Sequence, residues 1–182
     1  MNPFALFDER PIVVALAGPN GAGKTTFYHA HLAAAGLRFV NADVLASELG
    51  INAAQAMATA AALRSALVRR RESFVIETVF SDPVGDKLSF LAGLPSQGYT
   101  VVLCYIGLAS AEQSDERVAM RVTQGGHDVP REKLATRYPR TLANLHVAIR
   151  QLPNVLVFDN SDLSRPFRLV AVYEHGDVIP YP

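Results

Sequence analysis

The sequence is poor in cysteine, carries no net charge and lacks a long hydrophobic run, and each absence excludes a class of protein. One cysteine among 182 residues cannot form a disulfide within the chain, so nothing indicates an oxidising compartment. Seventeen basic residues balance seventeen acidic ones, which argues against non-specific binding to nucleic acid or to an anionic membrane. No apolar run reaches the ~20 residues of a membrane helix. We therefore expect a cytoplasmic protein with neither a nucleic-acid nor a membrane partner.

The chain contains instead short apolar runs that alternate with longer helical stretches. Hydrophobic residues make up 49% of it and charged residues 19%, a composition typical of one globular domain over residues 1–182. The alternation predicts an α/β fold with a mostly parallel five-stranded sheet and helices on both faces. The expected strands are Ile12–Ala17, Arg38–Asn41, Phe74–Thr78, Thr100–Ile106 and Val155–Asp159. The expected helices are roughly Lys24–Ala35, Ala53–Arg71, Asp86–Gln97, Ala111–Thr123 and Arg131–Leu152.

Two further segments complete the fold prediction. The tail FRLVAVYEHGDVIPY predicts a C-terminal β-ribbon that turns at residues 175–177 and extends the sheet at its edge. Cys104 lies in the apolar run TVVLCYIGL, where we expect it to be a small buried hydrophobic side chain.

The most specific motif is the run GPNGAGKT at residues 18–25, which matches the P-loop pattern GxxxxGK[ST]. It lies between the apolar strand IVVALA and a predicted helix, the context that binds a nucleoside triphosphate. Glycines let successive backbone N–H groups point at the β-phosphate, and the helix adds the positive end of its dipole. Lys24 would reach the β- and γ-phosphates, the Thr25 hydroxyl would hold Mg²⁺, and Thr26 would donate toward the α-phosphate. The nucleotide-binding residues expected here are Gly18, Asn20, Gly21, Ala22, Gly23, Lys24, Thr25 and Thr26.

Other patterns separate the classes of P-loop protein. A transporter-type or motor ATPase would carry an apolar strand ending in Asp-Glu and a signature such as LSGGQ, and a GTPase would carry NKxD; the sequence has neither. The run DPVG at residues 82–85 satisfies DxxG, but two fixed positions recur by chance. Two classes remain, a phosphotransferase that acts on a small molecule and a P-loop fold used only for binding.

Two carboxylates end neighbouring predicted strands and are the expected partners of the phosphates. Asp43 follows the second strand, at the sheet edge where α/β folds bind ligands, and could take the proton of an acceptor hydroxyl; it could also cap the helix that follows. Glu77 ends the third strand and could hold a magnesium-bound water or a substrate hydroxyl. Thr78 and Ser81 come next, as substrate contacts or as ordinary turn residues.

The segment 111–150 gathers arginines and predicts a helical lid. Gly125-Gly126 supplies a hinge between two helices, and Arg side chains offer planar, permanently charged donors to a transferring phosphoryl group. We expect Arg121 and Arg137 to close on the phosphates, with Arg140 close behind them. His127 either bonds within the loop or contacts nucleotide or substrate. Pro139 should kink or divide the second helix.

With these residues in view, the chain resembles the zeta-toxin-like family of P-loop kinases. The resemblance runs from the P-loop through Asp43 and Glu77 to RVAMRVTQGGHDVPREKLATRYPRTLANL at residues 117–145 and FDNS at residues 158–161. It implies transfer of the γ-phosphate of ATP or GTP to a small acceptor; the best-known members phosphorylate the amino-sugar 3′-hydroxyl of UDP-N-acetylglucosamine. By resemblance, the family's catalytic base matches Asp43, its P-loop lysine Lys24, its phosphate-clamping arginines Arg121 and Arg137, and its adenine-side residues Asn160 and Ser161.

One departure bears on the acceptor. Zeta toxins proper have Gly-Thr-x-Arg after the glutamate that corresponds to Glu77, and the Thr and Arg hold the substrate; this chain has TVFS at residues 78–81 and lacks that arginine. The sequence therefore predicts an ATP- and Mg²⁺-dependent kinase of a small hydroxylated metabolite. The resemblance implies UDP-N-acetylglucosamine as one acceptor to consider and an antitoxin as a partner. The alternative is a nucleotide-binding module or incidental ATPase that acts within a toxin–antitoxin pair.

Overall fold

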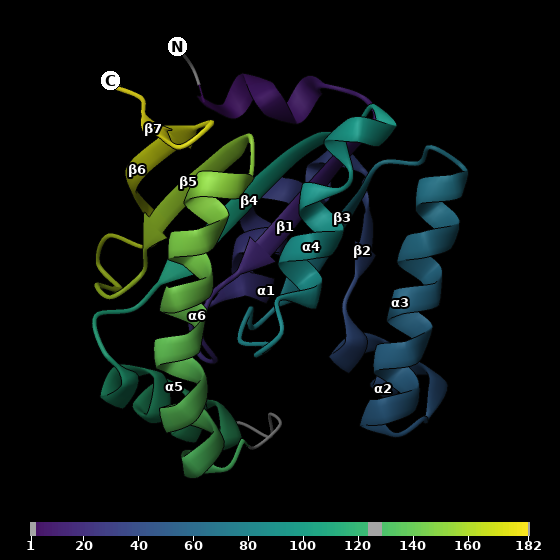
Figure 1. The fold of residues 1–182 in the computed structure, drawn as a ribbon. Coiled ribbons are helices and arrows are strands. Elements are labelled where there is room, and N and C mark those ends of the chain that lie inside the picture. The colour runs from purple at the N-terminus through teal and green to yellow at the C-terminus, as the bar shows by residue number, and fades with distance from the viewer. Residues whose placement is uncertain (1–2, 124–128, 182) are drawn as a thin grey trace.

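The computed structural model describes residues 3–123 and 129–181 and contains a central sheet with helices on both faces (Figure 1). Within these ranges the strand order is β2-β3-β1-β4-β5-β6-β7. Strands β1 to β5 run parallel to one another, and β6 and β7 are antiparallel additions beside β5. The strands are β1 (Ile12–Ala17), β2 (Arg38–Val40), β3 (Phe74–Thr78), β4 (Thr100–Gly107), β5 (Asn154–Asp159), β6 (Arg168–Glu174) and β7 (Asp177–Val178).

The helices connect the parallel strands. Helix α1 continues without a break into a π-helical turn and a 3₁₀ turn, and 3₁₀ turns also precede β1 and β4. The helices are η1 (Pro3–Asp8), α1 (Lys24–Phe27), η2 (Tyr28–Leu32), η3 (Ala33–Ala35), α2 (Ala42–Leu49), α3 (Ala53–Arg69), α4 (Asp86–Ala92), η4 (Pro95–Gln97), α5 (Ala111–Thr123) and α6 (Arg131–Gln151).

Strand β1 lies in the middle of the five parallel strands and is buried on both faces. All six of its residues are fully buried, which explains why its sequence is continuously apolar instead of alternating. Val13, Ala15 and Ala17 face a core shared with α3, α4 and α6. Ile12, Val14 and Leu16 face a second core, against α1 and η2. The carboxyl end of β1 therefore leads directly from the densest part of the molecule into the P-loop.

The structure confirms the predicted α/β fold and most of its elements. Strands β1 and β3 and helix α5 have the predicted bounds, and the C-terminal ribbon turns at His175–Gly176 as expected. The sheet has more strands than the five predicted, because the two ribbon strands continue it beyond β5.

The helices differ from prediction in four places. The helix expected over residues 24–35 is α-helical only over Lys24–Phe27, and the one expected over residues 86–97 ends at Ala92. Asn52 forms a capping box with Gln55, which starts α3, and a separate helix α2 precedes it. Pro139 does not divide α6, which is continuous from Arg131 to Gln151. Pro139 and Ala135, whose carbonyl loses a partner, are both exposed, so water can replace the missing hydrogen bond. No helix in the described ranges combines the length and apolarity needed to span a bilayer.

Burial makes Cys104 a test of the fold. The side chain is fully buried in β4, and burial raises the pKa of its thiol far above the ordinary value. We expect the native protein at pH 8 to react with a thiol reagent such as DTNB only as it unfolds, and one thiol per chain to react at once in denaturant. Rapid stoichiometric labelling of the native protein would contradict this placement of β4.

Candidate functional site

The P-loop joins β1 to α1 and needs glycine where it approaches other backbone. Gly18 has φ +139°, and a Cβ there would lie 2.1 Å from the carbonyl oxygen of Ile106 in β4. Gly23 has φ +86° and precedes α1 as its N-cap; a Cβ there would lie 2.9 Å from Nδ2 of Asn160. Any side chain at either position would move the loop away from the neighbouring strand ends. The loop shape that the motif predicts is therefore fixed by contacts with β4 and with the residue after β5.

Lys24 is buried and folds back over the loop. Its side chain is 7% exposed, and Nζ donates to the carbonyl oxygens of Gly18, at 3.0 Å, and Pro19, at 2.9 Å. Burial lowers the pKa of Lys24; the carboxylates of Glu77 and Asp43 act against this, and Arg121 adds to it. An ammonium group has three donors, so one N–H remains beyond these two bonds for an anion in the loop.

Thr25 and Glu77 meet at the carboxyl ends of neighbouring strands. The Thr25 hydroxyl donates to Oε2 of Glu77 at 2.8 Å, because β1 pairs directly with β3. Two oxygen ligands suit Mg²⁺, which takes few protein ligands and completes its shell with phosphate and water. The pair therefore fits the ion that the motif predicts. No group of three or more His, Cys, Asp or Glu side chains in the described ranges is arranged to hold a metal.

Asp43 lies at the start of α2 but does not cap it. The cap is Asn41, whose Oδ1 accepts from the backbone N–H groups of Asp43, at 2.7 Å, and Val44, at 3.3 Å. The Asp43 side chain is exposed, and its carboxylate acts on the pKa of Lys24. The cap is thus provided by Asn41, and the carboxylate of Asp43 lies within electrostatic reach of Lys24.

The loop after Glu77 is tied to α6. Oγ1 of Thr78 accepts from the N–H of Phe80 at 3.0 Å, which makes this hydroxyl part of the turn. Thr141 donates to the carbonyl of Val79 at 2.8 Å, and Asn144 donates to the carbonyl of Phe80 at 2.9 Å. Ser81 is half-buried in the same loop. Substrate contacts by Thr78 and Ser81 stay a prediction, and Asn144 is a structural residue of this loop to which the sequence pattern gave no function.

An open cleft of about 740 Å³ lies over the P-loop. Its walls are the P-loop, one face of α5 and residues 161–163 after β5. The predicted residues that line it are Gly21, Gly23, Lys24, Thr25, Thr26, Glu77 and Arg121, together with Ser161, which the resemblance places at the adenine side. The predicted residues Gly18, Asn20, Ala22, Asp43 and Asn160 are not among its lining residues. Lining residues for which the residue patterns gave no function are Gln113, Glu116, Arg117, Met120, Asp162 and Leu163. Those on α5 follow the three- and four-residue spacing of one helix face, so Arg121 itself could have indicated them. A smaller pocket, of 140 Å³, lies at the opposite end of β5 beside η1 and contains no predicted site residue.

The predicted arginines divide into two groups. Arg121 lines the cleft and lowers the pKa of Lys24, so it lies within electrostatic reach of the phosphate position. Arg137 is half-buried and Arg140 exposed on α6, and neither is among the residues that line the cleft. Their contacts with phosphate or substrate stay predictions. His127 and the Gly125-Gly126 hinge lie outside the described residues.

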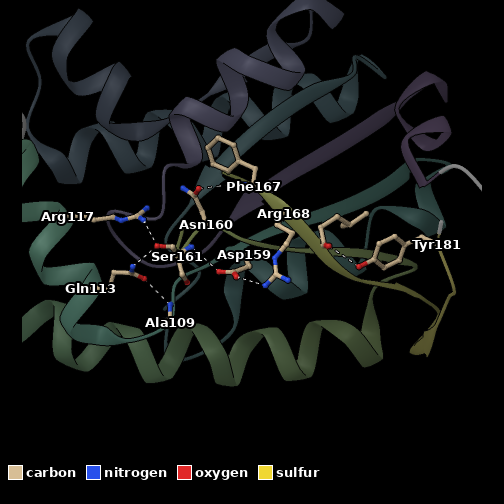
Figure 2. Close-up of polar contacts among 10 residues, drawn as sticks. Ala109, Gln113, Arg117, Asp159, Asn160, Ser161, Phe167, Arg168 and Tyr181 are labelled. Carbon is tan, nitrogen blue, oxygen red and sulfur yellow. Dashed lines mark hydrogen bonds and ion pairs between the residues drawn. The ribbon is translucent and has the colours of Figure 1, made fainter. Parts of the chain in front are cut away.

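Residues after β5 join the P-loop to α5 (Figure 2). The carbonyl oxygen of Ser161 accepts from Nε2 of Gln113 at 2.8 Å and from an Arg117 guanidinium nitrogen at 3.1 Å. Asn160 is 3% exposed and donates to the carbonyl of Ala22 at 2.9 Å. Oγ of Ser114 donates to the carbonyl of Asn20 at 2.7 Å, which bonds α5 directly to the P-loop. A nucleotide contact by Asn160 stays a prediction, and the bonds of its side chain are to the protein.

A family profile and several solved structures are similar to this chain. The profile of the AAA domain family AAA_33 matches residues 13–138. A chain of the AvrRxo1-ORF1:AvrRxo1-ORF2 complex, in crystals with sulphate ions and with ATP, has 21% identity and a TM-score of 0.75. That similarity covers 97% of this chain and 63% of the other, so this chain spans less than two thirds of the length of that protein. No curated protein sequence matches the chain.

Two further structures are similar at lower TM-scores. One is from the PezAT chromosomal toxin–antitoxin system of Streptococcus pneumoniae, with 17% identity, a TM-score of 0.59, and coverage of 90% of this chain and 72% of that one. The other is a protein of Chloroflexus aurantiacus named as a candidate kinase, with 20% identity, a TM-score of 0.58, and coverage of 86% and 92%. At these identities the likeness shows that this chain shares the fold of these proteins.

Close contact at Gly18 gives a quantitative prediction. Alanine at Gly50 meets a positive φ of +62° and open space, and should cost about 1 kcal/mol of unfolding free energy. Alanine at Gly18 also meets the Ile106 carbonyl, so Gly18→Ala should cost about 1–3 kcal/mol more than Gly50→Ala. Urea denaturation of the two variants measures the difference. Equal losses would mean that the P-loop does not approach β4 as described.

Proposed function

We propose that this chain, which belongs to the AAA domain family AAA_33, is an ATP-dependent phosphotransferase that phosphorylates a hydroxyl group of a small metabolite. The observation that supports it best is the electrostatic grouping around Lys24. A buried ammonium group in a P-loop interacts with two carboxylates, Asp43 and Glu77, and with the guanidinium of Arg121. Binding alone requires the loop and the lysine, whereas a transfer reaction also requires a base and a second cation near the γ-phosphate.

In the proposed reaction, the protein holds the phosphates and moves one proton. Backbone N–H groups of the P-loop and the start of α1 hold the β-phosphate, and Lys24 exchanges its bonds to the loop carbonyls for phosphate oxygens. Asp43 accepts the proton of the acceptor hydroxyl while the oxygen of that hydroxyl bonds to the γ-phosphorus. The bond between the γ-phosphorus and the β–γ bridging oxygen breaks, and ADP leaves. Arg121 and Lys24 stabilise the negative charge on the transferring group.

The magnesium ion and the adenine ring complete the nucleotide site in this proposal. Thr25 and Glu77 would hold Mg²⁺, which neutralises charge on the β- and γ-phosphate oxygens when bound. The adenine ring would lie between α5 and residues 161–163. Arg117 is bonded to Ser161 there, and the exposed apolar side chains of Met120 and Leu163 line the same cleft. A flat guanidinium and apolar atoms are suitable partners for a planar base.

The acceptor and the protein partner are the finer parts of the proposal. UDP-N-acetylglucosamine is the first acceptor to test, because the resemblance to zeta toxins includes the proposed catalytic base Asp43 and the segment 117–145. Because this chain lacks the Gly-Thr-x-Arg that holds the substrate in zeta toxins, other hydroxylated metabolites must be tested beside it. The side chains proposed to contact the acceptor are Asp43, Glu77, Thr78, Ser81, His127 and Arg140. We also propose an antitoxin-like protein partner, since the PezAT structure is described as part of a toxin–antitoxin system.

Substitution at Asp43 separates transfer from binding. Asp43→Asn removes the proposed base, so the rate of product formation should fall by about 10²–10⁴-fold while ATP still binds. Lys24→Ala removes the side chain proposed to bind the phosphates and should abolish both ATP binding and product formation. Mass spectrometry of a panel of sugars, nucleosides and sugar nucleotides, with calorimetry of ATP binding, measures the two effects.

A matched control is Asp86→Asn. Asp86 is also an exposed aspartate in the first turn of a helix, α4, but does not act on the pKa of Lys24. Its variant should keep the wild-type rate. Full turnover in Asp43→Asn would refute the base, and ATP binding by the wild type with no acceptor phosphorylated in the panel would favour the incidental ATPase or binding module.

The magnesium site makes a separate prediction. Thr25→Val keeps the shape of the side chain but removes the hydroxyl that lies beside Glu77. We expect this variant to bind ATP in EDTA about as tightly as the wild type does, and to lose the gain in affinity that Mg²⁺ gives the wild type. Titration calorimetry with and without Mg²⁺ tests this, and an undiminished Mg²⁺ effect would remove Thr25 from the site.

A further inference from the structure

Asn160 is a buried polar residue that bonds to three separate parts of the chain. It follows β5 (Figure 2). Its exposed fraction is 3%. Its backbone N–H donates to the carbonyl of Gly107, at the end of β4, at 3.0 Å. Its Nδ2 donates to the carbonyl of Ala22 in the P-loop at 2.9 Å, and its Oδ1 accepts from the N–H of Phe167 at 3.2 Å. One residue thus bonds to a strand end, the P-loop and the loop that leads to β6.

These partners leave the amide with a single possible orientation. Ala22 offers a carbonyl, which needs a donor, and Phe167 offers an N–H, which needs an acceptor. Only the amide with nitrogen toward the P-loop satisfies both. Aspartate in the same place would turn an oxygen toward the carbonyl of Ala22, and two acceptors would then face each other in a buried site.

Gly23, the glycine directly before Lys24, packs against the same group. A Cβ at Gly23 would lie 2.9 Å from Nδ2 of Asn160 and 3.4 Å from the ring of Phe167. Asn160 and Phe167 therefore form the surface on which this turn of the P-loop rests. The backbone of the loop next to the phosphate-binding lysine is held by residues more than 130 positions further along the chain.

The backbone of Phe167 indicates that this contact is specific. Phe167 has φ +57°, a left-handed conformation that costs energy in a residue other than glycine and persists where the surroundings require it. Here the conformation delivers its N–H to Asn160, while its ring packs edge-on against Phe27 at 5.3 Å between centroids and against His31 at 5.7 Å. Both partners belong to the helix that follows the P-loop.

We infer that Asn160 is a positioning residue that holds the P-loop in its phosphate-binding shape before nucleotide arrives. It acts through Ala22 and Gly23 and does not itself touch the phosphates. The inference deepens the proposed function, on which it rests for its ligand. It also gives Asn160 a different task from the adenine contact that the resemblance implies.

Asn160→Asp and Asn154→Asp form a matched pair. Asn154 lies at the other end of β5, is half-buried, and likewise donates its Nδ2 to a backbone carbonyl, that of Val101, at 2.9 Å. The two substitutions each remove one amide donor, at the start of β5 and just after its end, and only the Asn160 donor bonds to the P-loop. ATP·Mg²⁺ binding by calorimetry well below the melting temperature, and hydrogen exchange of residues 18–26 in the free protein, are measured for both.

We expect Asn160→Asp to raise the Kd for ATP about 10- to 100-fold, because a buried acceptor is left unpaired beside the loop, and Asn154→Asp to change it by less than about twofold. Amide exchange in residues 18–26 should rise in the first variant only. Both variants should lower the melting temperature, because each loses a hydrogen bond. If Asn160 were only a structural residue, the two variants would therefore have the same Kd for ATP and the same amide exchange in residues 18–26. Asn160→Ser, which keeps a short polar group in the same space, serves if the aspartate variant does not fold.

The result that overturns the inference is a wild-type Kd and wild-type exchange of the loop in a folded Asn160 variant. If the wild-type protein itself fails to bind ATP, the proposed function fails. The exchange measurement still tests the positioning residue in that case, because it is made on the free protein.

Discussion

A buried ammonium group needs compensation, and in this protein that need shapes the site around the P-loop. Lys24 has lost most of its water, and two carbonyl oxygens of its own loop take the place of hydration. Such an arrangement is stable only if the loop keeps those carbonyls pointing inward. The close approach of Gly18 to β4, the bond from Asn160 and the bond from α5 through Ser114 all act on that loop geometry. Each uses a different strand or helix, so the phosphate-binding conformation is a property of the whole fold.

Patterns that involve neighbours in the sequence predicted the fold well. Continuous apolar runs gave β1 and β3 because both strands are covered on both faces, and the P-loop motif lies between the strand and the helix that it requires. The extent of the helix over 131–151 was predicted, but its continuity through Pro139 was not. The hydrogen bond that the proline removes can be replaced by water because this part of the helix is exposed, and that exposure is not visible in the sequence. Separate helices α2 and α3 depend on the caps Asn41 and Asn52, which are short-range signals and could have been recognised.

Functional groups that depend on distant neighbours could not be predicted in the same way. A single asparagine carries no periodicity, so no residue pattern distinguishes Asn144 or Asn160 from surface residues, and the resemblance indicated Asn160 only as an adenine-side residue. Asn144 bonds to the loop after β3 only because α6 lies beside that loop, and Asn160 bonds to the P-loop only because β5 ends beside it. Arg121, by contrast, belongs to a helix face whose spacing is visible in the sequence, and it lines the cleft; its contact with phosphate stays a prediction.

Helix α6 is held at two places by separate sets of contacts. Thr141 and Asn144 fasten its middle to the loop after β3, and Ala148 belongs to the main core. Val118 of α5, Leu134 of α6 and Val129, which precedes α6, form a small apolar cluster of their own. Because this cluster is separate from the two cores of the sheet, removing apolar area from it acts on the contact between α5 and α6 and leaves the interior of the sheet covered.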